Sequence, residues 1–284
     1  MRRFPRRHRP PVREGMISAF STGSLYPAEP EKAVLAACDA GFRTLEIFVN
    51  CEYEWSDEYI SHLRALLEER GMRVTSIHPY QSGSESFMLF ADYPRRRREV
   101  VAYYKKCILA TARYGAKYFI LHGPGRSAEK FRPLFPHEID VYRELLDYGD
   151  SVGVMVLQEN VRKFLSAFPE TFRHLAEAVP ELGYNLDFKQ AVQSGQTIED
   201  MIDAMGGRIR NVHINDLDEN DRCRLPGEGR LSYQDLFRRL RETGFDGVLV
   251  TEVYRRDIAE LSRIRTSRLF LEGELSRFER SWGK

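Results

Sequence analysis

Short apolar runs alternate with longer amphipathic stretches along most of the chain. The runs are rich in Val, Ile, Leu and Phe and are bounded by polar or glycine-containing segments, which predicts buried β-strands. The predicted strands are residues 16–21, 44–49, 73–78, 117–122, 154–160, 184–188, 211–216 and 248–254.

The stretches between these runs carry apolar residues three and four positions apart, as expected for helices with one buried stripe. Residues 56–71 have the clearest limits, because Ser56 is a suitable N-cap and Gly71 a suitable stop. The predicted helices are residues 31–41, 56–71, 97–115, 138–149, 170–179, 197–205, 233–244 and 257–275.

This regular alternation predicts an α/β fold, a single-domain (β/α)8 TIM barrel spanning residues 16–284. A doubly wound open sheet is the main competitor. That fold usually has a glycine-rich phosphate turn after its first strand, and "STGSLYP", residues 21–27, does not match G-x-G-x-x-G. The pattern therefore favours the barrel.

The composition is that of a soluble globular protein, with 42% hydrophobic and 30% charged residues. No apolar run reaches the roughly 18 residues of a membrane span. The four cysteines are far apart and form no C-x-x-C pair, which favours free thiols in a reducing cytoplasm over a disulfide framework.

The net charge of +1 conceals an asymmetry. Residues 1–13 contain six arginines and no acid, so the remainder carries 1 − 6 = −5. Residues 1–15 are rich in proline as well and are predicted to be a disordered, Arg-rich N-terminal tail. The mildly acidic remainder makes nucleic acid an unfavourable partner, since phosphate binding requires a basic face.

Six consecutive predicted strands carry a polar, ligand-type side chain at their C-terminal ends, where barrels of this kind place their active sites. These residues are His78, His122, Glu159, Asp187, His213 and Glu252. A single such residue is more often structural, but the last four lie on successive strands. Buried carboxylates are costly unless paired or metal-bound, so this set predicts a site for Mn²⁺, Mg²⁺, Co²⁺ or Zn²⁺.

The chain resembles the xylose isomerase-like TIM barrels, the superfamily of sugar phosphate isomerases and epimerases, over about residues 16–275. The resemblance is carried by "FSTGSLYP", "LEIF", "LHGPG", "QEN", "LDFKQA", "VHIND" and, most specifically, "LPGEGRLSYQDLFRRLRETGFDGVLVTEVY". It implies that Glu159, Asp187, His213 and Glu252 bind one divalent metal ion, and that Glu159 and Glu252 also act as an acid and base pair.

The implied activity is a metal-dependent isomerisation or epimerisation of a sugar or sugar phosphate. A divalent ion stabilises the cis-enediolate, one glutamate removes the proton beside the carbonyl, and the other returns a proton. The residues expected to contact this carbohydrate substrate are His78, His122, Gln190, Arg222 and Arg224. Arg255 is a further candidate, and homo-oligomerisation is left open.

Two positions depart from the family pattern. Gln190 stands where a histidine is frequent, and Cys223 where an arginine or histidine is frequent. Both weaken an endonuclease IV-like interpretation, which requires a trinuclear zinc cluster with further histidines. The same residues also fit a metal-dependent lyase or dehydratase acting on a keto-sugar or polyol, and they fit a non-catalytic sugar-binding barrel.

Overall fold

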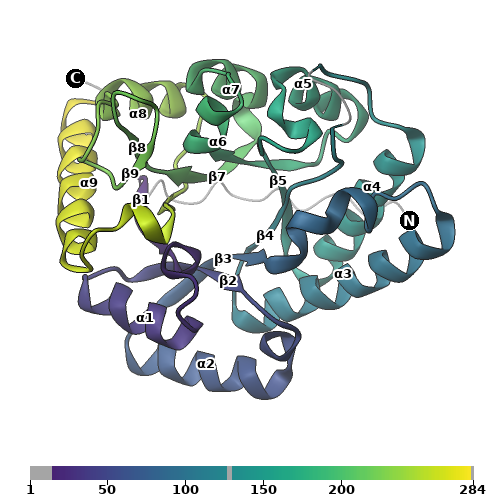
Figure 1. The fold of residues 1–284 in the computed structure, drawn as a ribbon, viewed down its shortest axis with the longest axis horizontal. Coiled ribbons are helices and arrows are strands. Elements are labelled where there is room, and N and C mark those ends of the chain that lie inside the picture. Colours follow the sequence, from purple (N-terminus) through teal and green to yellow (C-terminus); the bar gives the residue numbers. More distant parts are fainter. Residues whose placement is uncertain (1–14, 127–129, 283–284) are drawn as a thin grey trace, which may run out of the picture.

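The computed structural model describes residues 15–126 and 130–282, so the predicted tail lies outside the described residues except for its last position. Eight parallel strands close into a barrel in the order β1-β10-β7-β6-β5-β4-β3-β2, which confirms the predicted (β/α)8 fold (Figure 1). The strands are β1 Ile17–Ser21, β2 Thr44–Val49, β3 Arg73–Pro79, β4 Tyr118–Leu121, β5 Met155–Glu159, β6 Gly183–Asp187, β7 Ile209–Ile214 and β10 Val248–Thr251.

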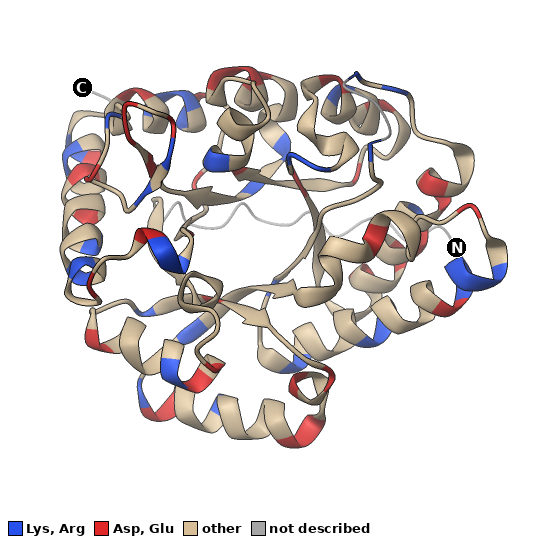
Figure 2. Ribbon diagram, viewed as in Figure 1, with Lys and Arg blue, Asp and Glu red and all other residues tan. Residues whose placement is uncertain are grey.

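The helices form a ring outside the strands (Figure 1), and Figure 2 shows residues of both signs of charge interspersed along them. They are α1 Pro30–Asp39, α2 Asp57–Glu69, α3 Pro94–Tyr114, α4 Pro136–Val152, α5 Pro169–Ala178, α6 Phe188–Gln193, α7 Ile198–Met205, α8 Tyr233–Glu242 and α9 Ser262–Ser281. The Ser56 side chain caps α2 by accepting from the Tyr59 N–H, as predicted. Within the described residues, no helix has the length and apolar character needed to cross a membrane.

Three elements on the C-terminal side of the barrel differ from the predicted pattern. The 3₁₀ segment η3, Tyr80–Phe87, follows β3, and the short helix α6 follows β6 with no intervening loop. An antiparallel hairpin of β8, Asp216–Leu217, and β9, Cys223–Arg224, lies between β7 and α8. Asp216, predicted to end the seventh strand, therefore belongs to this hairpin.

The inside of the barrel is unusually polar where it approaches the C-terminal ends of the strands. Glu46 accepts a hydrogen bond from the Ser76 hydroxyl at 2.8 Å, and the Asn211 amide donates to the Asn185 side chain at 3.0 Å. All four residues are fully buried. Buried polar groups are tolerated when they bond one another, and these pairs lie next to the strand ends that carry the site.

Candidate metal and catalytic site

The six predicted strand-end residues all reach the same end of the barrel. Glu159 and Asp187 are the last residues of β5 and β6, and Glu252 directly follows β10. His78 and His213 lie within β3 and β7 near their ends, and His122 follows β4.

His213 is at the centre of the first cluster and is fully buried. Its Nδ1 lies 3.0 Å from Glu159 Oε1, 3.5 Å from Asp187 Oδ2 and 3.3 Å from Glu252 Oε2. One ring nitrogen thus faces three carboxylates. The four ligand atoms lie within 4.8 Å of one another, a separation suited to one shared cation.

Glu46 was not foreseen as part of the site, although it occupies the polar position of "LEIF". Its Oε2 lies 3.0 Å from His213 Nε2, on the opposite side of the ring from the three carboxylates. An Nε2–H donated to Glu46 leaves Nδ1 as the metal-binding nitrogen, the arrangement that most metal-ligating histidines show. A glutamate inside an apolar strand was the available signal.

The donor set and its surroundings fit a divalent cation. Burial lowers the pKa of His213, but the charges of Glu46, Glu252 and Glu159 raise it well above its ordinary value. The ring therefore carries a proton in the metal-free chain, and an ion bound at Nδ1 would take that proton's place. Burying several carboxylates around one nitrogen is costly unless positive charge, from a protonated side chain or from a bound ion, lies among them.

The two glutamates proposed as acid and base are ionised in this environment. Burial raises the pKa of Glu159, but the His213 charge and the hydrogen bonds from His122 and His213 bring it well below its usual range. For Glu252, burial is likewise outweighed by the charges of Lys189 and His213, which leave its pKa well below its usual range. Each is therefore a carboxylate in the metal-free chain, the form in which a glutamate can act as a base.

Lys189 is the second residue that sequence reasoning missed. It is the second residue of α6 and is only 3% exposed. Its Nζ donates to both Asp187 Oδ2 and Glu252 Oε2. Burial lowers the pKa of Lys189, but these two carboxylates raise it well above its ordinary value, so it is an ammonium ion. The lysine is visible in the "LDFKQA" motif, but the sequence does not tell that its side chain points toward Asp187 and Glu252.

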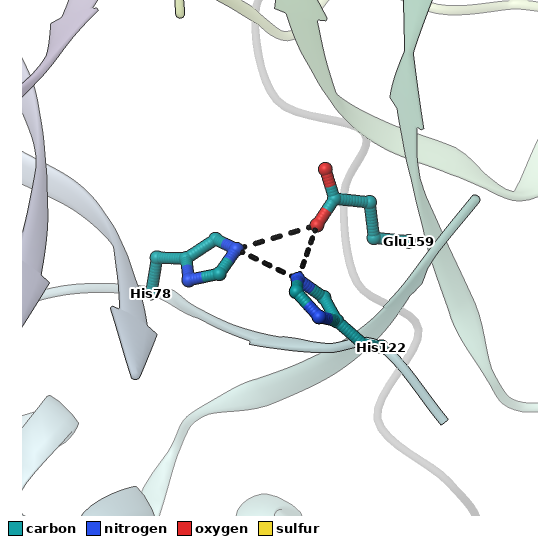
Figure 3. Close-up of side chains that lie close together, drawn as sticks. All are labelled: His78, His122 and Glu159. Atoms are coloured by element: carbon teal, nitrogen blue, oxygen red, sulfur yellow. Dashed lines mark hydrogen bonds and ion pairs between the residues drawn. The ribbon is translucent and has the colours of Figure 1, made fainter. Parts of the chain in front are cut away.

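A second cluster joins His78, His122 and Glu159 (Figure 3). His78 Nε2 lies 3.1 Å from His122 Nε2 and 3.3 Å from Glu159 Oε2, and His122 Nε2 lies 3.2 Å from the same oxygen. Burial lowers the pKa of His78, but the hydrogen bond and charge of Glu159, together with the charges of Glu46 and Glu252, raise it above its ordinary value. For His122 the effect of burial prevails, and its pKa is lowered.

Glu85, on η3, supports this second cluster from behind. It is fully buried, and its Oε2 accepts the backbone N–H groups of His122 at 2.8 Å and Gly123 at 2.6 Å. The Tyr104 hydroxyl donates to its other oxygen at 3.2 Å. Burial raises the pKa of Glu85 to about 8. This residue fixes the chain where it leaves β4.

Two adjoining cavities open above the clusters. One, about 630 Å³, is lined by Phe48, His78, Glu159, Lys189, Glu252 and neighbouring residues. The other, about 810 Å³, is lined by Arg162, Arg222, Cys223 and neighbouring residues. His122, Gln190, Tyr254 and Arg256 line both, so the two cavities adjoin each other.

Of the remaining residues predicted to contact the substrate, some line the cavities and one does not. Gln190 lines both cavities, Arg222 lines the larger one, and Arg255 lines the smaller one. Arg224 is not among the lining residues; its guanidinium pairs with Asp218 at 2.6 Å and lies 3.8 Å from Asp257. Gln190 is also held in place, since its Oε1 accepts the Arg162 N–H at 3.1 Å.

Comparison with known proteins shows the family of this chain. Residues 34–273 match the family profile described as xylose isomerase-like TIM barrel. The chain belongs to this family. It is 22% identical over 239 residues to fructoselysine 3-epimerase from Shigella flexneri, covering 78% of this chain and 84% of the relative.

Solved structures share the fold across nearly the whole chain. A D-tagatose 3-epimerase-like protein superposes with a TM-score of 0.72 at 18% identity, covering 93% of this chain and 98% of that chain. A D-psicose 3-epimerase determined in the presence of D-fructose superposes with a TM-score of 0.73 at 14% identity, covering 92% and 99%.

Proposed function

We propose that this protein is a divalent-metal-dependent epimerase or isomerase of a ketose or ketose derivative. The observation that carries the proposal is the convergence of Glu159, Asp187 and Glu252 on Nδ1 of His213. Two of these carboxylates, Glu159 and Glu252, also line the cavity in which a substrate would lie. The similarity to fructoselysine 3-epimerase and to D-psicose 3-epimerase supports a sugar substrate.

Glu159, Asp187, His213 and Glu252 would hold the ion. A bound Mn²⁺, Mg²⁺, Co²⁺ or Zn²⁺ would supply positive charge that stabilises an enediolate. One of Glu159 and Glu252 would act as the carboxylate base and remove the proton from the carbon beside the carbonyl. The other would enter the step protonated and give its own proton to the enediolate, so that the two glutamates exchange protonation states. Delivery to the opposite face of the same carbon gives an epimer, whereas delivery to the neighbouring carbon gives an isomer.

The other cavity residues would orient the sugar. A ring N–H of His78 can donate a hydrogen bond to a substrate oxygen beside Glu159, and Gln190 presents an amide to a hydroxyl. The larger cavity leaves room for a substituent beyond a simple ketose, and Arg162 and Arg222 lie at its wall. A phosphate or carboxylate on the substrate would fit their charge.

The test is the paired substitution Glu159→Gln and Glu252→Gln, which keeps side-chain size but removes the base. Each should lower turnover of an accepted ketose by about 10²- to 10⁴-fold, the range for losing acid–base catalysis. Metal content is measured in every variant, because both residues are proposed ligands. Glu219→Gln, an exposed carboxylate on the β8–β9 loop, is the control and should leave turnover unchanged. Full turnover in both variants with metal retained would contradict the proposed pair.

A further inference from the structure

Lys189 occupies an unexpected place among the proposed metal ligands. Its Nζ bonds Asp187 Oδ2 and Glu252 Oε2, the same two oxygens that lie 3.5 and 3.3 Å from Nδ1 of His213. The ammonium and a divalent ion would therefore use the same carboxylate oxygens. Since both are cations, they could not both lie at full contact with these oxygens without strong repulsion.

The position of Lys189 follows from local structure. Asp187 is the N-cap of α6, and its Oδ1 accepts the Gln190 N–H at 2.9 Å. This bond leaves Oδ2 free for another partner. The first turn of α6 places Lys189 two residues later, close enough for its side chain to fold back across the strand end. The short α6 thus places a cation beside the two carboxylates in the folded chain.

The ammonium has a further contact on the cavity side. In the position in which it bonds the two carboxylates, Lys189 Nζ is 5.8 Å from the centre of the Tyr254 ring, and both residues line the smaller cavity. An aromatic face attracts an ammonium ion at about this distance. An ion that took Asp187 and Glu252 would displace the ammonium toward this ring and the cavity beside it.

We propose that Lys189 is a tethered cation that competes with the divalent ion for Asp187 and Glu252, so that the ion binds fully only when the ammonium withdraws. The inference rests on the metal-binding part of the proposed function. Lys189 neutralises the carboxylates in the metal-free chain and keeps the site assembled. It also weakens the affinity for the ion, because each binding event must displace the ammonium.

The test is Mn²⁺ binding to metal-free protein, followed by the electron paramagnetic resonance signal of the free ion. Lys189→Met, which keeps most of the side-chain volume without charge, should bind Mn²⁺ at least about tenfold more tightly than the wild type. Lys163→Met removes one positive charge from an exposed lysine at the larger cavity and should change the affinity less than about twofold. Lys189→Gln provides a second neutral variant if the methionine variant does not fold.

Thermal unfolding gives an independent readout. Metal removal should lower the melting temperature of Lys189→Met more than that of the wild type, because its carboxylates then lack a compensating charge. Saturating Mn²⁺ should restore the variant, since a ligand stabilises the state that binds it.

The outcomes separate this inference from the proposed function. Mn²⁺ binding no tighter in either neutral variant than in the wild type would overturn the competition, even if the wild type proves an active epimerase. Tighter binding in the variants supports it, even if no ketose is turned over. Absence of Mn²⁺ binding in all chains would overturn both the competition and the metal dependence.

Discussion

At the scale of single residues, the site depends on which nitrogen of His213 faces the carboxylates. Glu46, on the other side of the ring at 3.0 Å from Nε2, determines this orientation, and it is itself held by the Ser76 hydroxyl. Glu46 therefore controls which nitrogen of His213 is available to the ion, although Glu46 itself lies on the other side of the ring from the proposed metal position.

Glu46→Gln removes this charge and allows the ring to change its hydrogen bonding. The affinity for Mn²⁺ should fall by about 10- to 100-fold, the usual effect of losing a partner of a ligating histidine. Ser76→Ala removes a hydrogen bond to Glu46 but leaves its charge, and should weaken binding much less. The measurement is the same Mn²⁺ titration, and an unchanged affinity in Glu46→Gln would show that Glu46 does not orient His213.

Only some of these site residues could be predicted from the sequence. The strand-end set could be predicted because each member follows an apolar run, where a polar side chain stands out. Glu46 lies in the middle of such a run, and its role requires β2 and β7 to face each other across the closed barrel. Lys189 could not be foreseen, because its direction depends on α6 beginning immediately at Asp187.

At the scale of elements, the segments that follow the strands shape the site. The alternation of strands and helices predicted the framework, but η3 and the β8–β9 hairpin are held by contacts with residues outside them, and α6, with six residues, is too short to show a clear periodicity. Asp216 accepts the N–H groups of Gly227 at 3.1 Å and Leu231 at 3.0 Å, which gives the hairpin its shape. Periodicity carries no information on such contacts, so these segments were not predicted.

Glu85 of η3 accepts the N–H groups that follow β4, and this contact should make the free energy of unfolding depend on pH. Burial raises the pKa of Glu85 from an ordinary 4.5 to about 8, so the folded chain holds this proton more tightly than the unfolded chain. Its contribution is fully present below about pH 4.5 and is lost as the pH rises through about 8. Wild-type stability should therefore fall across this interval on account of Glu85.

Glu85→Gln resembles the protonated acid and keeps an oxygen for the His122 and Gly123 N–H groups. The free energy of unfolding, measured with urea at pH 5 and pH 8, should shift in favour of the variant at the higher pH by roughly a few kcal/mol at most. Glu219→Gln, which removes an exposed charge, is the control. A difference between wild type and Glu85→Gln that does not change with pH would contradict the raised pKa.

At the scale of the whole molecule, closure of the barrel brings the first and last strands together. Ile17 pairs with Val248 and Phe20 with Thr251. On its other side β10 pairs with β7, so the strands that carry the four proposed ligands lie in the unbroken order β5-β6-β7-β10. The number and order of elements sufficed to predict that closure. The shape of the two adjoining cavities could not be predicted, because side chains from many separate segments line them.

The central claim is that two glutamates at a metal site move a proton beside a sugar carbonyl. NMR in deuterated water, with Mn²⁺ and a panel of D-fructose, D-tagatose, D-psicose, their phosphates and fructoselysine, tests it most directly. We expect a metal-dependent product that carries solvent deuterium at the carbon that was inverted or newly reduced. Product formed without solvent deuterium at that carbon, or formed equally well after complete metal removal, would contradict the claim.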